Sequence, residues 1–530
     1  MSTDPRAPAG PRTPAEPPAP AGPPATADPR TARRFRILLY GSIAVFALLA
    51  AGLVALNLTQ GPRMTAAQLN VATSVERAGQ RLLLQANEVI APVADAQVTV
   101  SPAAEVKTTT NQTSIQIEFT GILAYNTTYT VTATGVRSTS LDATSTFSYS
   151  FTTPDANVFT LLRGQPDDRI ERSSLTAGTG ETVYSAPNIS LFTTLGQKLV
   201  VATTDSDGYD LLDIVSPDGS AASIPVQLAG PGTVTGLVSS AKSNLFGYTY
   251  RAAPSPYYPT SDDQLYIYDT TLGQAYSIPV TGPDRELLAV QSWAFLPGTT
   301  SLVVQDPGGA LFLVDALGLL DGSSAAVEVG SADALLGFLP NTKTLVTETA
   351  GSASTIDFAQ PGTPVTAPFA LAAAPPNGSL AAPATAAAAA AATGGPATGA
   401  AAEATAPGEP AALTGAPAAT GGTGGATAAH PEPLDASGTI VTPGPDATTL
   451  QKITGTGTET LFTAPEGSTI IRSCLSTNGR YAVAETAPAT AAAAEAPDVA
   501  ADATTTYIPL DDPTASRTVA GSNPDWCSAA

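Results

Sequence analysis

The residues that most often carry out catalysis are scarce in this chain. Its single histidine, His430, lies between Ala429 and Pro431 in a tract rich in Gly, Ala and Pro. A Ser-His-Asp or Cys-His site needs a histidine held in a folded domain, so we expect no histidine-based catalysis. The motifs G-x-x-x-x-G-K-[ST], H-E-x-x-H and C-x-x-C do not occur either. The sequence therefore excludes the common signatures of phosphate-binding loops, zinc proteases and redox dithiols.

One acidic segment has the composition of a calcium loop. Asp205-Ser-Asp-Gly-Tyr-Asp210 places three carboxylates around a glycine, and Asp213 follows shortly after. Calcium prefers carboxylate and carbonyl oxygens as ligands. The same segment is also typical of an ordinary hairpin turn between Val201 and Leu211. We expect the hairpin turn, with calcium binding as the alternative.

Paired carboxylates are the remaining route to catalysis, because glycosidase chemistry needs two of them and no histidine. The candidates by position are Asp263, Asp269, Asp284, Glu286 and Asp306. None of them stands in a recognisable motif, and solvated acidic turns explain them equally well. We therefore expect no catalytic residue, no cofactor-binding residue and no metal ligand.

The two cysteines of the chain, Cys474 and Cys527, both lie near its C-terminal end. Two cysteines in so long a chain fit an oxidising exterior in which they pair. The bridge would fasten the terminal segment, and closing this loop of ~53 residues contributes about 4 kcal/mol in the chain-entropy model. The alternative is a reactive or metal-binding pair, but no third or fourth ligand is evident. We predict a disulfide.

The elements that must position these residues begin with an apolar segment at 37–58. It has 22 residues without a charge, enough at ~1.5 Å per residue to cross a ~30 Å hydrocarbon core. A cleaved signal peptide is the alternative, but its apolar region runs only about 7–15 residues. Arginines precede the segment more often than they follow it closely: Arg30, Arg33, Arg34 and Arg36 against Arg63. The positive-inside rule predicts a single-pass membrane protein with a cytoplasmic N-terminus and an extracytoplasmic C-terminal region.

The charge of the chain differs between the two sides of this segment. Residues 1–36 carry six arginines and three acidic residues, a net charge of +3, so the remainder carries −22 − 3 = −25. A field of that sign repels nucleic acid, which excludes nucleic-acid binding. Residues 1–36 form a disordered Pro-rich tail with proline at every third position from Pro5 to Pro23, the repeat of a polyproline II helix. We expect a low-complexity tail, and a PxxP ligand is the alternative.

Short alternating runs follow the membrane segment in residues 64–154. The expected strands are LLLQ (82–85), AQVTVS (96–101), SIQIEF (114–119), TYTVTATGV (128–136) and FSYSFTTP (147–154). Such strands, each with one buried face, indicate a small β-sandwich. In this order, GQRLLLQANEVI, LAYNTTYTVTATGV and FSYSFTTP resemble the bacterial Ig-like domain of surface-layer proteins. That resemblance implies a spacer or adhesive module. The acidic D-x-x-G-N turn of the family is absent, so no metal at that turn is implied.

From about Val158 onward the sequence repeats itself. WAFLPGTTSLVV and GFLPNTKTLVT align with Phe295 over Phe338, an interval of 43 residues, and looser copies begin at Leu191, Leu237 and Cys474. Each copy is an apolar strand, a polar turn and a second apolar strand. A period of about 40–50 residues with four short strands is typical of a β-propeller blade.

Outer strand pairs at 264–280 and 310–318 complete the expected four-stranded sheets. The pattern resembles the TolB-like and WD40-like propeller repeats of exported bacterial proteins, although no WD dipeptide closes a blade and other residues replace the usual Asp-Gly turn. Five hairpins plus a split blade built from 158–187 and the tail predict six blades, with five or seven allowed. The expected fold class is thus all-β, an Ig-like sandwich plus a β-propeller.

Two tracts rich in Ala, Gly, Pro and Thr interrupt the second domain, at 371–436 and 486–503. They have almost no large apolar side chains to bury, so we expect disorder. The expected division is a tail at 1–36, a transmembrane helix at 37–58, the sandwich at 64–154, the first part of the propeller at 158–370, the insertion at 371–436 and the last part of the propeller at 437–530.

This organisation favours a binding role over catalysis. We expect a membrane-anchored extracytoplasmic binding or scaffold protein of the bacterial cell envelope, in which the spacer presents a propeller to a protein or a cell-wall ligand. The alternative is a propeller-fold hydrolase that acts on wall glycans through paired carboxylates. The ligand, the oligomeric state and any role of the insertion stay open.

Overall fold

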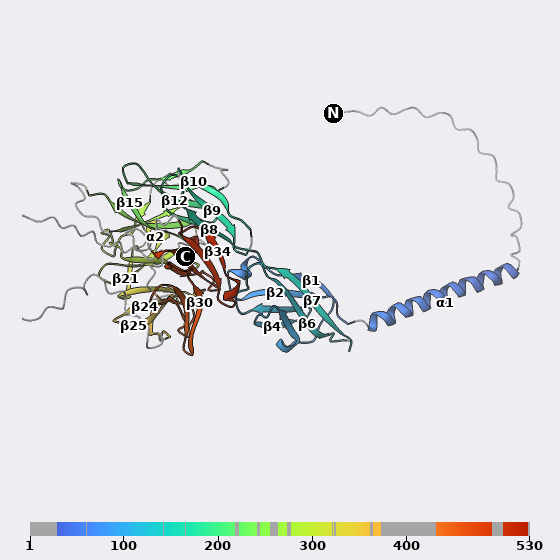
Figure 1. Cartoon of the computed structure of the whole chain (residues 1–530). Helices are drawn as coiled ribbons and strands as arrows, with labels where there is room; N and C mark the ends of the chain where they lie inside the picture. Colours follow the sequence, from blue (N-terminus) through green and yellow to red (C-terminus); the bar gives the residue numbers. More distant parts are fainter. Residues whose placement is uncertain are drawn as a thin grey trace, which may run out of the picture.

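A computed structural model gives the fold of the chain (Figure 1). The described residues are 29–59, 61–140, 142–164, 166–176, 178–217, 222–240, 244–254, 263–272, 277–320, 322, 325–360, 364–372, 431–489 and 502–527, with side chains of the first helix only at 33–52. This part of the chain is almost entirely β-structure after one long helix. His430 and the Pro-rich tail up to residue 28 lie outside the described residues.

The helix α1 (Pro29–Thr59) contains the predicted apolar segment and begins ahead of it. Proline is well suited to the first position of a helix, and no helix breaker follows it among the arginines. The stretch Arg33–Gly52 is long and apolar enough to cross a membrane, and none of it is buried against the rest of the described structure. By its length and composition, a helix of this kind near the N-terminus could serve as a membrane anchor or a signal sequence.

A seven-stranded β-sandwich follows the helix. One sheet has the order β1 (Met64–Gln68), β2 (Gln80–Ala86), β5 (Ser114–Phe119), β4 (Val106–Asn111), and the other β3 (Val98–Ser101), β6 (Thr128–Arg137), β7 (Thr144–Thr152). The alternating side chains of the predicted strands point into one core, formed by Leu82, Leu84, Ile115, Ile117 and Val131 among others. The predicted strands are therefore confirmed. β1 (MTAAQ) has no alternation of large apolar residues and β4 (VKTTTN) is mostly polar, which is why the apolar pattern did not reveal them.

Seven antiparallel sheets are described after the sandwich, each with its strands in sequence order. They are β8 (Asn157–Leu162), β9 (Asp168–Ser174), β10 (Glu181–Ala186); β11 (Ile189–Leu195), β12 (Lys198–Thr204), β13 (Asp210–Val215), β14 (Ile224–Val226); β15 (Gly232–Ser239), β16 (Leu245–Ala252), β17 (Gln264–Asp269), β18 (Ile278–Pro279); β19 (Ser292–Phe295), β20 (Ser301–Gln305), β21 (Ala310–Asp315), β22 (Val327–Ser331); β23 (Ala334–Phe338), β24 (Thr344–Thr349), β25 (Ser352–Asp357), β26 (Val365–Pro368); β27 (Glu432–Pro433), β28 (Ile440–Pro443), β29 (Thr449–Thr454), β30 (Gly457–Thr463); and β31 (Ser468–Leu475), β32 (Tyr481–Pro488), β33 (Thr504–Pro509), β34 (Arg517–Ala520). A short helix, α2 (Ala316–Leu320), follows β21.

The seven sheets form a closed, propeller-like ring. Apolar clusters join the neighbouring sheets; Leu265 and Trp293, for example, join the third sheet to the fourth. Between the fifth and sixth sheets the connection runs through Leu371, which packs on both the cluster of the fifth sheet and the cluster that contains Ile440. A further cluster, which includes Val158 and Tyr507, joins the last sheet to the first. We call the sheets from β8 to β34, with the C-terminal segment, the ring, and the contact between its last and first sheets the seam.

The five predicted hairpins each form the first two strands of a sheet, and the tail completes the first sheet through the pairing of Leu161 with Ser522. The structure describes seven sheets, one more than the six favoured from the sequence and within the five to seven allowed, because β27–β30 form a sheet that no hairpin repeat marked. Its first strand is only Glu432–Pro433. The insertion predicted for 371–436 therefore ends before residue 432, and the last part of the ring begins there rather than at 437.

Candidate functional site

The five carboxylates considered for glycosidase chemistry are spread over several turns. Asp263 forms a two-armed ion pair with Arg251, at 2.9 Å for each arm. Three others accept hydrogen bonds from backbone groups of their own turns: Asp269 from Thr271, Asp284 from Glu286 and Asp306 from Ala310. These contacts give four of the five a local structural role. These contacts do not pair any two of the five carboxylates as the acid and base of a glycosidase.

The acidic segment 205–210 is a hairpin turn between β12 and β13. The Asp205 carboxylate accepts hydrogen bonds from the backbone N–H groups of Asp207 (2.8 Å) and Tyr209 (3.0 Å). Asp210, in contrast, is buried within the ring, and its carboxylate accepts a hydrogen bond from the hydroxyl of Thr204 at 2.7 Å. Within the described ranges, no group of three or more His, Cys, Asp or Glu side chains is placed to hold a metal ion.

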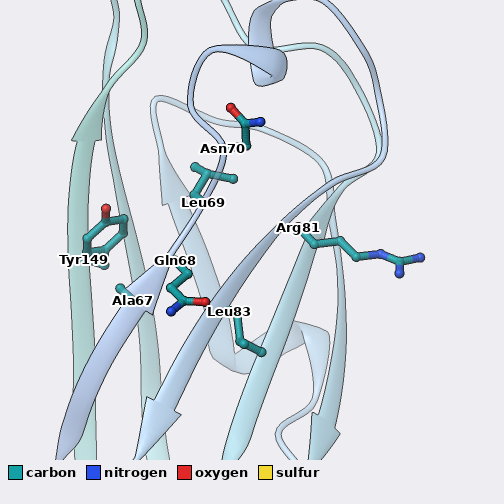
Figure 2. Close-up of a pocket in the computed structure, with 7 residues that line it drawn as sticks. All are labelled: Ala67, Gln68, Leu69, Asn70, Arg81, Leu83 and Tyr149. Carbon is teal, nitrogen blue, oxygen red and sulfur yellow. The ribbon is translucent and has the colours of Figure 1, made fainter.

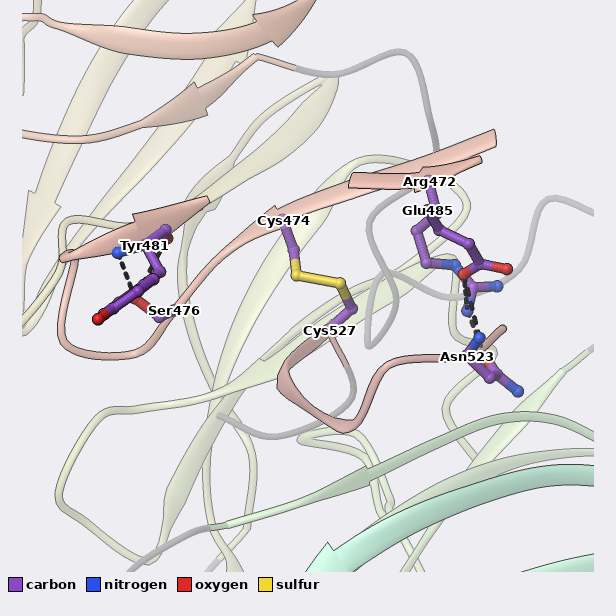
Figure 3. Close-up of a disulfide and its surroundings, with 7 residues drawn as sticks. All are labelled: Arg472, Cys474, Ser476, Tyr481, Glu485, Asn523 and Cys527. Carbon is purple, nitrogen blue, oxygen red and sulfur yellow. Dashed lines mark hydrogen bonds and ion pairs between the residues drawn. A yellow bond between two sulfur atoms is a disulfide. The ribbon is translucent and has the colours of Figure 1, made fainter. Parts of the chain in front are cut away.

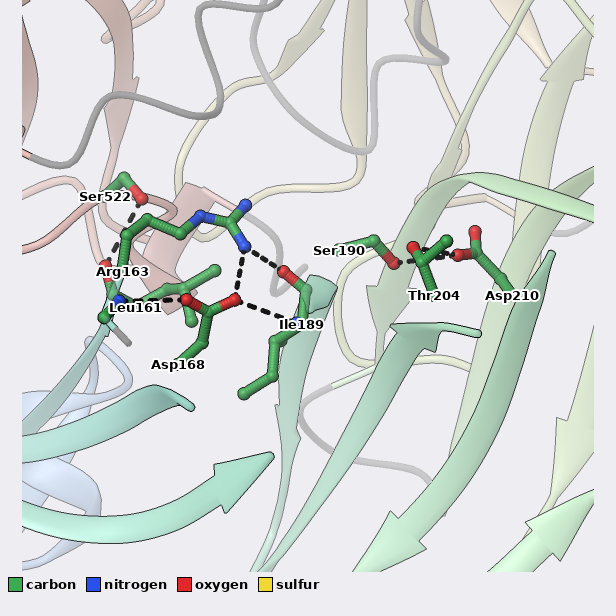
Figure 4. Close-up of polar contacts among 9 residues, drawn as sticks. Leu161, Arg163, Asp168, Ile189, Ser190, Thr204, Asp210 and Ser522 are labelled. Atoms are coloured by element: carbon green, nitrogen blue, oxygen red, sulfur yellow. Dashed lines mark hydrogen bonds and ion pairs between the residues drawn. The ribbon is translucent and has the colours of Figure 1, made fainter. Parts of the chain in front are cut away.

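Two buried aspartates connect neighbouring sheets of the ring (Figure 4). Asp168, the first residue of β9, accepts a hydrogen bond from the backbone N–H of Ile189 in β11 (3.0 Å) and pairs with Arg163 at 2.9 Å. Asp210, the first residue of β13, accepts from the N–H of Val234 in β15 (2.7 Å). Each carboxylate thus fixes the first strand of the following sheet. Charge-assisted hydrogen bonds of this kind are among the stronger ones in proteins.

The C-terminal segment closes the ring at the seam (Figure 3). Leu161 and Ser522 exchange two backbone hydrogen bonds, of 2.8 and 2.9 Å. The Glu485 carboxylate accepts from the N–H of Asn523 at 3.1 Å. A disulfide joins Cys474 in β31 to Cys527, as predicted from the sequence. The terminal segment is therefore held by backbone pairing, a buried carboxylate and a covalent bond.

Asp525 is a second buried carboxylate of the seam. It accepts a hydrogen bond from the backbone N–H of Phe159 at 3.0 Å and lies near the hydroxyl of Thr194. Burial raises its pKa to about 7, although both hydrogen bonds favour the charged form and limit the shift. The charged state of the seam therefore changes close to neutral pH.

The sandwich is packed directly against the ring at the seam. The ring of Tyr125 lies 5.9 Å from that of Tyr481 and 6.3 Å from that of Trp526. Burial raises the pKa of Tyr125 to about 12. The Asn478 side chain donates a hydrogen bond to the backbone carbonyl of Val75, in the short helix η1 (Thr73–Val75), at 2.9 Å. An aromatic cluster and a buried hydrogen bond thus hold the two parts together.

Polar contacts extend this junction along the connecting segment. The Asp155 carboxylate accepts hydrogen bonds from the hydroxyls of Ser174 and Thr176, the second at 2.7 Å. Asn126 in the sandwich donates to the Thr176 hydroxyl at 2.8 Å. The short segment that connects the sandwich to the ring is therefore hydrogen-bonded to the ring, and the sandwich is hydrogen-bonded to the same turn of the ring.

The opposite end of the sandwich holds the chain that leaves the helix. One residue separates Thr59, the end of α1, from Gly61. A Cβ atom at Gly61 would lie 2.5 Å from the Ser145 hydroxyl oxygen and 2.7 Å from the Thr144 backbone, so only glycine fits there. Pro62 is buried, and the Arg63 N–H donates to the Asn87 side chain at 2.7 Å. The segment is thus fixed to the sandwich from Gly61 onward.

The turns of the ring fall on two faces. Because neighbouring strands are antiparallel, the turns after first and third strands share one edge of each sheet, and those after second strands lie at the other. The sandwich contacts Asn478, in the turn after the first strand β31, and Thr176, in the turn after β9. Because the tail at Ser522 pairs with β8 as the first strand of that sheet, β9 is its third strand, and both turns belong to the first set. We call the second set, with the connections between sheets, the far face. Exposed or half-exposed acidic side chains on it include Asp205, Asp207, Asp284, Glu286, Asp306, Asp333, Asp446 and Glu466.

Comparisons with known proteins add little beyond this architecture. No protein-family model matches the chain, and no curated protein sequence matches it. Solved structures with some similarity include an uncharacterized protein from Listeria monocytogenes EGD-e (12% identity, 63% of this chain and 89% of that chain, TM-score 0.35). Another is the dihydro-heme d1 dehydrogenase NirN, with 10% identity over 69% of this chain and 74% of that chain and a TM-score of 0.36. A third is the RRP9 WD40 repeats, with 11% identity over 74% of this chain and 92% of that chain and a TM-score of 0.31. At these TM-scores the likeness carries no argument about function.

Proposed function

We propose that this chain is a membrane-anchored extracytoplasmic binding or scaffold protein, in which an Ig-like spacer holds a seven-bladed β-propeller away from the membrane. In this proposal α1 spans the membrane once with its N-terminus in the cytoplasm, and each of the seven sheets is one blade. The ligand is a protein or a component of the cell wall. The protein acts by binding and not by catalysis.

The observation that carries the proposal is the pair of fixed attachments at the two ends of the sandwich. Gly61 and Pro62 pack on one end, one residue after the helix, and Tyr125 packs on Trp526 at the other. Chains that need free movement between parts usually have flexible Gly/Ser-rich or extended Pro-rich linkers. Short, bonded connections instead favour a stalk that presents one surface at a set height and orientation.

The far face is the surface that we assign to ligand binding. It lies away from the sandwich and is formed by turns, which carry binding residues in many β-folds. Its acidic side chains favour a partner with a positively charged surface, because complementary charge raises the association rate. Binding to such a partner should weaken as salt is added.

Two matched double variants test this assignment. Asp207→Asn with Glu286→Gln removes two exposed charges from the far face, while Asp315→Asn with Glu328→Gln removes two exposed charges elsewhere on the ring. Full-length protein carrying a photocrosslinker at Tyr209 on the far face would be expressed in intact cells of its host. We expect one main crosslinked partner, which the first double variant weakens and the second leaves unchanged. Equal crosslinking by both variants would refute the assignment to the far face.

The orientation in the membrane needs its own measurement. Protease added to intact cells should remove a C-terminal tag while an N-terminal tag stays protected. A protected C-terminal tag in cells whose outer surface is accessible would reverse the proposed topology.

A further inference from the structure

A cavity of about 460 Å³ opens on the side of the sandwich, where one edge strand ends early (Figure 2). β1 pairs with β2 from Met64↔Ala86 to Gln68↔Leu83, but β2 extends further, to Gln80. Residues 69 and 70 leave the sheet at that point. Across the opening stands Tyr149 of β7, the edge strand of the other sheet. The early end of β1 thus leaves a notch at this edge of the sandwich, of a size within the ~300–1,000 Å³ typical of small-molecule sites.

The notch combines an apolar floor with side chains that form hydrogen bonds. Its apolar part consists of Ala67, Leu69 and Leu83, and the half-buried ring of Tyr149 forms one wall. Gln68 and Asn70 place exposed amides at its opening. Each amide offers both donors and acceptors. The ring of Tyr149 is also supported from behind, because it stacks on Phe151 with 6.0 Å between ring centroids.

The charge of the notch is balanced. Arg81 is the one Lys, Arg, Asp or Glu residue among the seven that line the cavity, and its Nε–H donates to the Glu118 carboxylate at 2.9 Å. In Figure 2 the Arg81 side chain extends away from Tyr149, at the outer side of the notch. A neutralised arginine gives little attraction for an anion, so the notch is suited to an uncharged ligand.

We propose that this notch binds a neutral glycan through one pyranose ring. A pyranose has a face of C–H groups that packs on an aromatic ring, and hydroxyls around its edge that both donate and accept hydrogen bonds. Tyr149 matches the first property, and the amides of Gln68 and Asn70 match the second. A peptide side chain or a lipid tail would use the apolar floor but would leave the exposed amides of Gln68 and Asn70 to water, so it would gain no hydrogen bond from them. This site lies on the spacer and is separate from the far face.

The test uses full-length protein in a detergent without a sugar head group. Saturation-transfer NMR with the neutral disaccharides cellobiose and N,N′-diacetylchitobiose should show transfer to the C–H face of one ring, with a Kd of order 1 mM. Tyr149→Ala should weaken binding about tenfold, whereas Tyr149→Phe keeps the ring and most of the affinity. Gln68→Ala should also weaken binding severalfold. Gln85→Ala is the matched control, since Gln85 is exposed on the same face of β2 but does not line the notch.

Thermal unfolding of each variant separates lost binding from lost folding. If Tyr149→Ala proves unstable, the comparison of Gln68→Ala with Gln85→Ala decides the question. The proposal is overturned if neither disaccharide shows transfer at about 10 mM, or if digalacturonate, an anionic disaccharide, binds more tightly than both. It is also overturned if Gln68→Ala and Gln85→Ala bind alike.

Discussion

Replacing Tyr125 by alanine should loosen the sandwich from the ring without unfolding either part. The side chain packs on the apolar cluster at the seam and makes ring contacts with Tyr481 and Trp526, and aromatic pairs contribute about 0.5–1.5 kcal/mol each beyond their buried area. Removing the half-buried phenol also exposes apolar surface, for roughly another 1 kcal/mol. The junction should therefore lose about 2–4 kcal/mol, which raises the fraction of open junction by roughly 30- to 700-fold.

Spin labels report this opening directly. The two native cysteines form a disulfide, so Thr109→Cys on the sandwich and Ser352→Cys on the ring, both exposed, can be labelled selectively. Pulsed electron paramagnetic resonance should give one narrow distance distribution for the parent protein and a broad one for Tyr125→Ala. Thermal melting should show that the ring and the sandwich remain folded.

Two controls make the result specific. Tyr125→Phe keeps both ring contacts and should preserve the narrow distribution. Tyr209→Ala removes a tyrosine from the far face, distant from the junction, and should also have no effect. If Tyr125→Ala leaves the distribution narrow, the aromatic cluster does not hold the junction, and the case for a fixed stalk loses its main support.

Three further predictions concern the ring itself. Replacing Cys474 and Cys527 by serine should lower the free energy of unfolding by about 4 kcal/mol in the chain-entropy model; a loss below about 1 kcal/mol in urea titration would contradict this. Burial raises the folded pKa of Asp525 from 3.8 to about 7, so its stabilising effect is full below about pH 4 and is lost as the pH rises to about 7. Asp525→Asn should therefore reduce the fall in Tm between about pH 4 and pH 7. If the variant's Tm falls with pH as steeply as that of the parent protein, this assignment to Asp525 is wrong. Gly247→Ala would place a Cβ atom 2.7 and 2.9 Å from ring carbons of buried Trp293 and should cost about 1–3 kcal/mol, which an unchanged Tm would disprove.

The sheet β27–β30 shows where the sequence pattern was insufficient. Repeats were recognised by an apolar hairpin of two full strands, but here the first strand is reduced to Glu432 and Pro433. A proline in a two-residue strand gives no periodicity to detect. The segments GTGETVYSAP (178–187) and GTGTETLFTAP (455–465) are similar to each other in sequence. They contain the outer strands of two sheets, β10 and β30, so the second of them marks the sheet that the hairpin pattern misses.

The connecting aspartates illustrate a second limit. Asp168 and Asp210 are the first residues of β9 and β13, and an aspartate at the end of a turn normally indicates a solvated position. Their role depends on Ile189 and Val234, residues about twenty positions further along the chain. Only the packing of one sheet on the next brings these groups together. The cysteine pair, in contrast, was predictable, because two cysteines allow a single pairing.

The length of the sandwich has an electrostatic consequence if α1 spans a membrane as we propose. β7 has nine residues, which at ~3.3 Å each separate its ends by about 30 Å; Gly61 packs at its first end and the ring at its last. The residues after the tail carry a net charge of −25, from −22 for the chain and +3 for residues 1–36, and anionic lipids would repel them near the surface. At physiological salt the Debye length is about 8 Å, so across some 30 Å this repulsion falls to a few per cent. A rigid spacer of this length therefore lets a strongly acidic ring stay close to a membrane at little electrostatic cost, whereas a flexible linker would not keep the two charged surfaces apart.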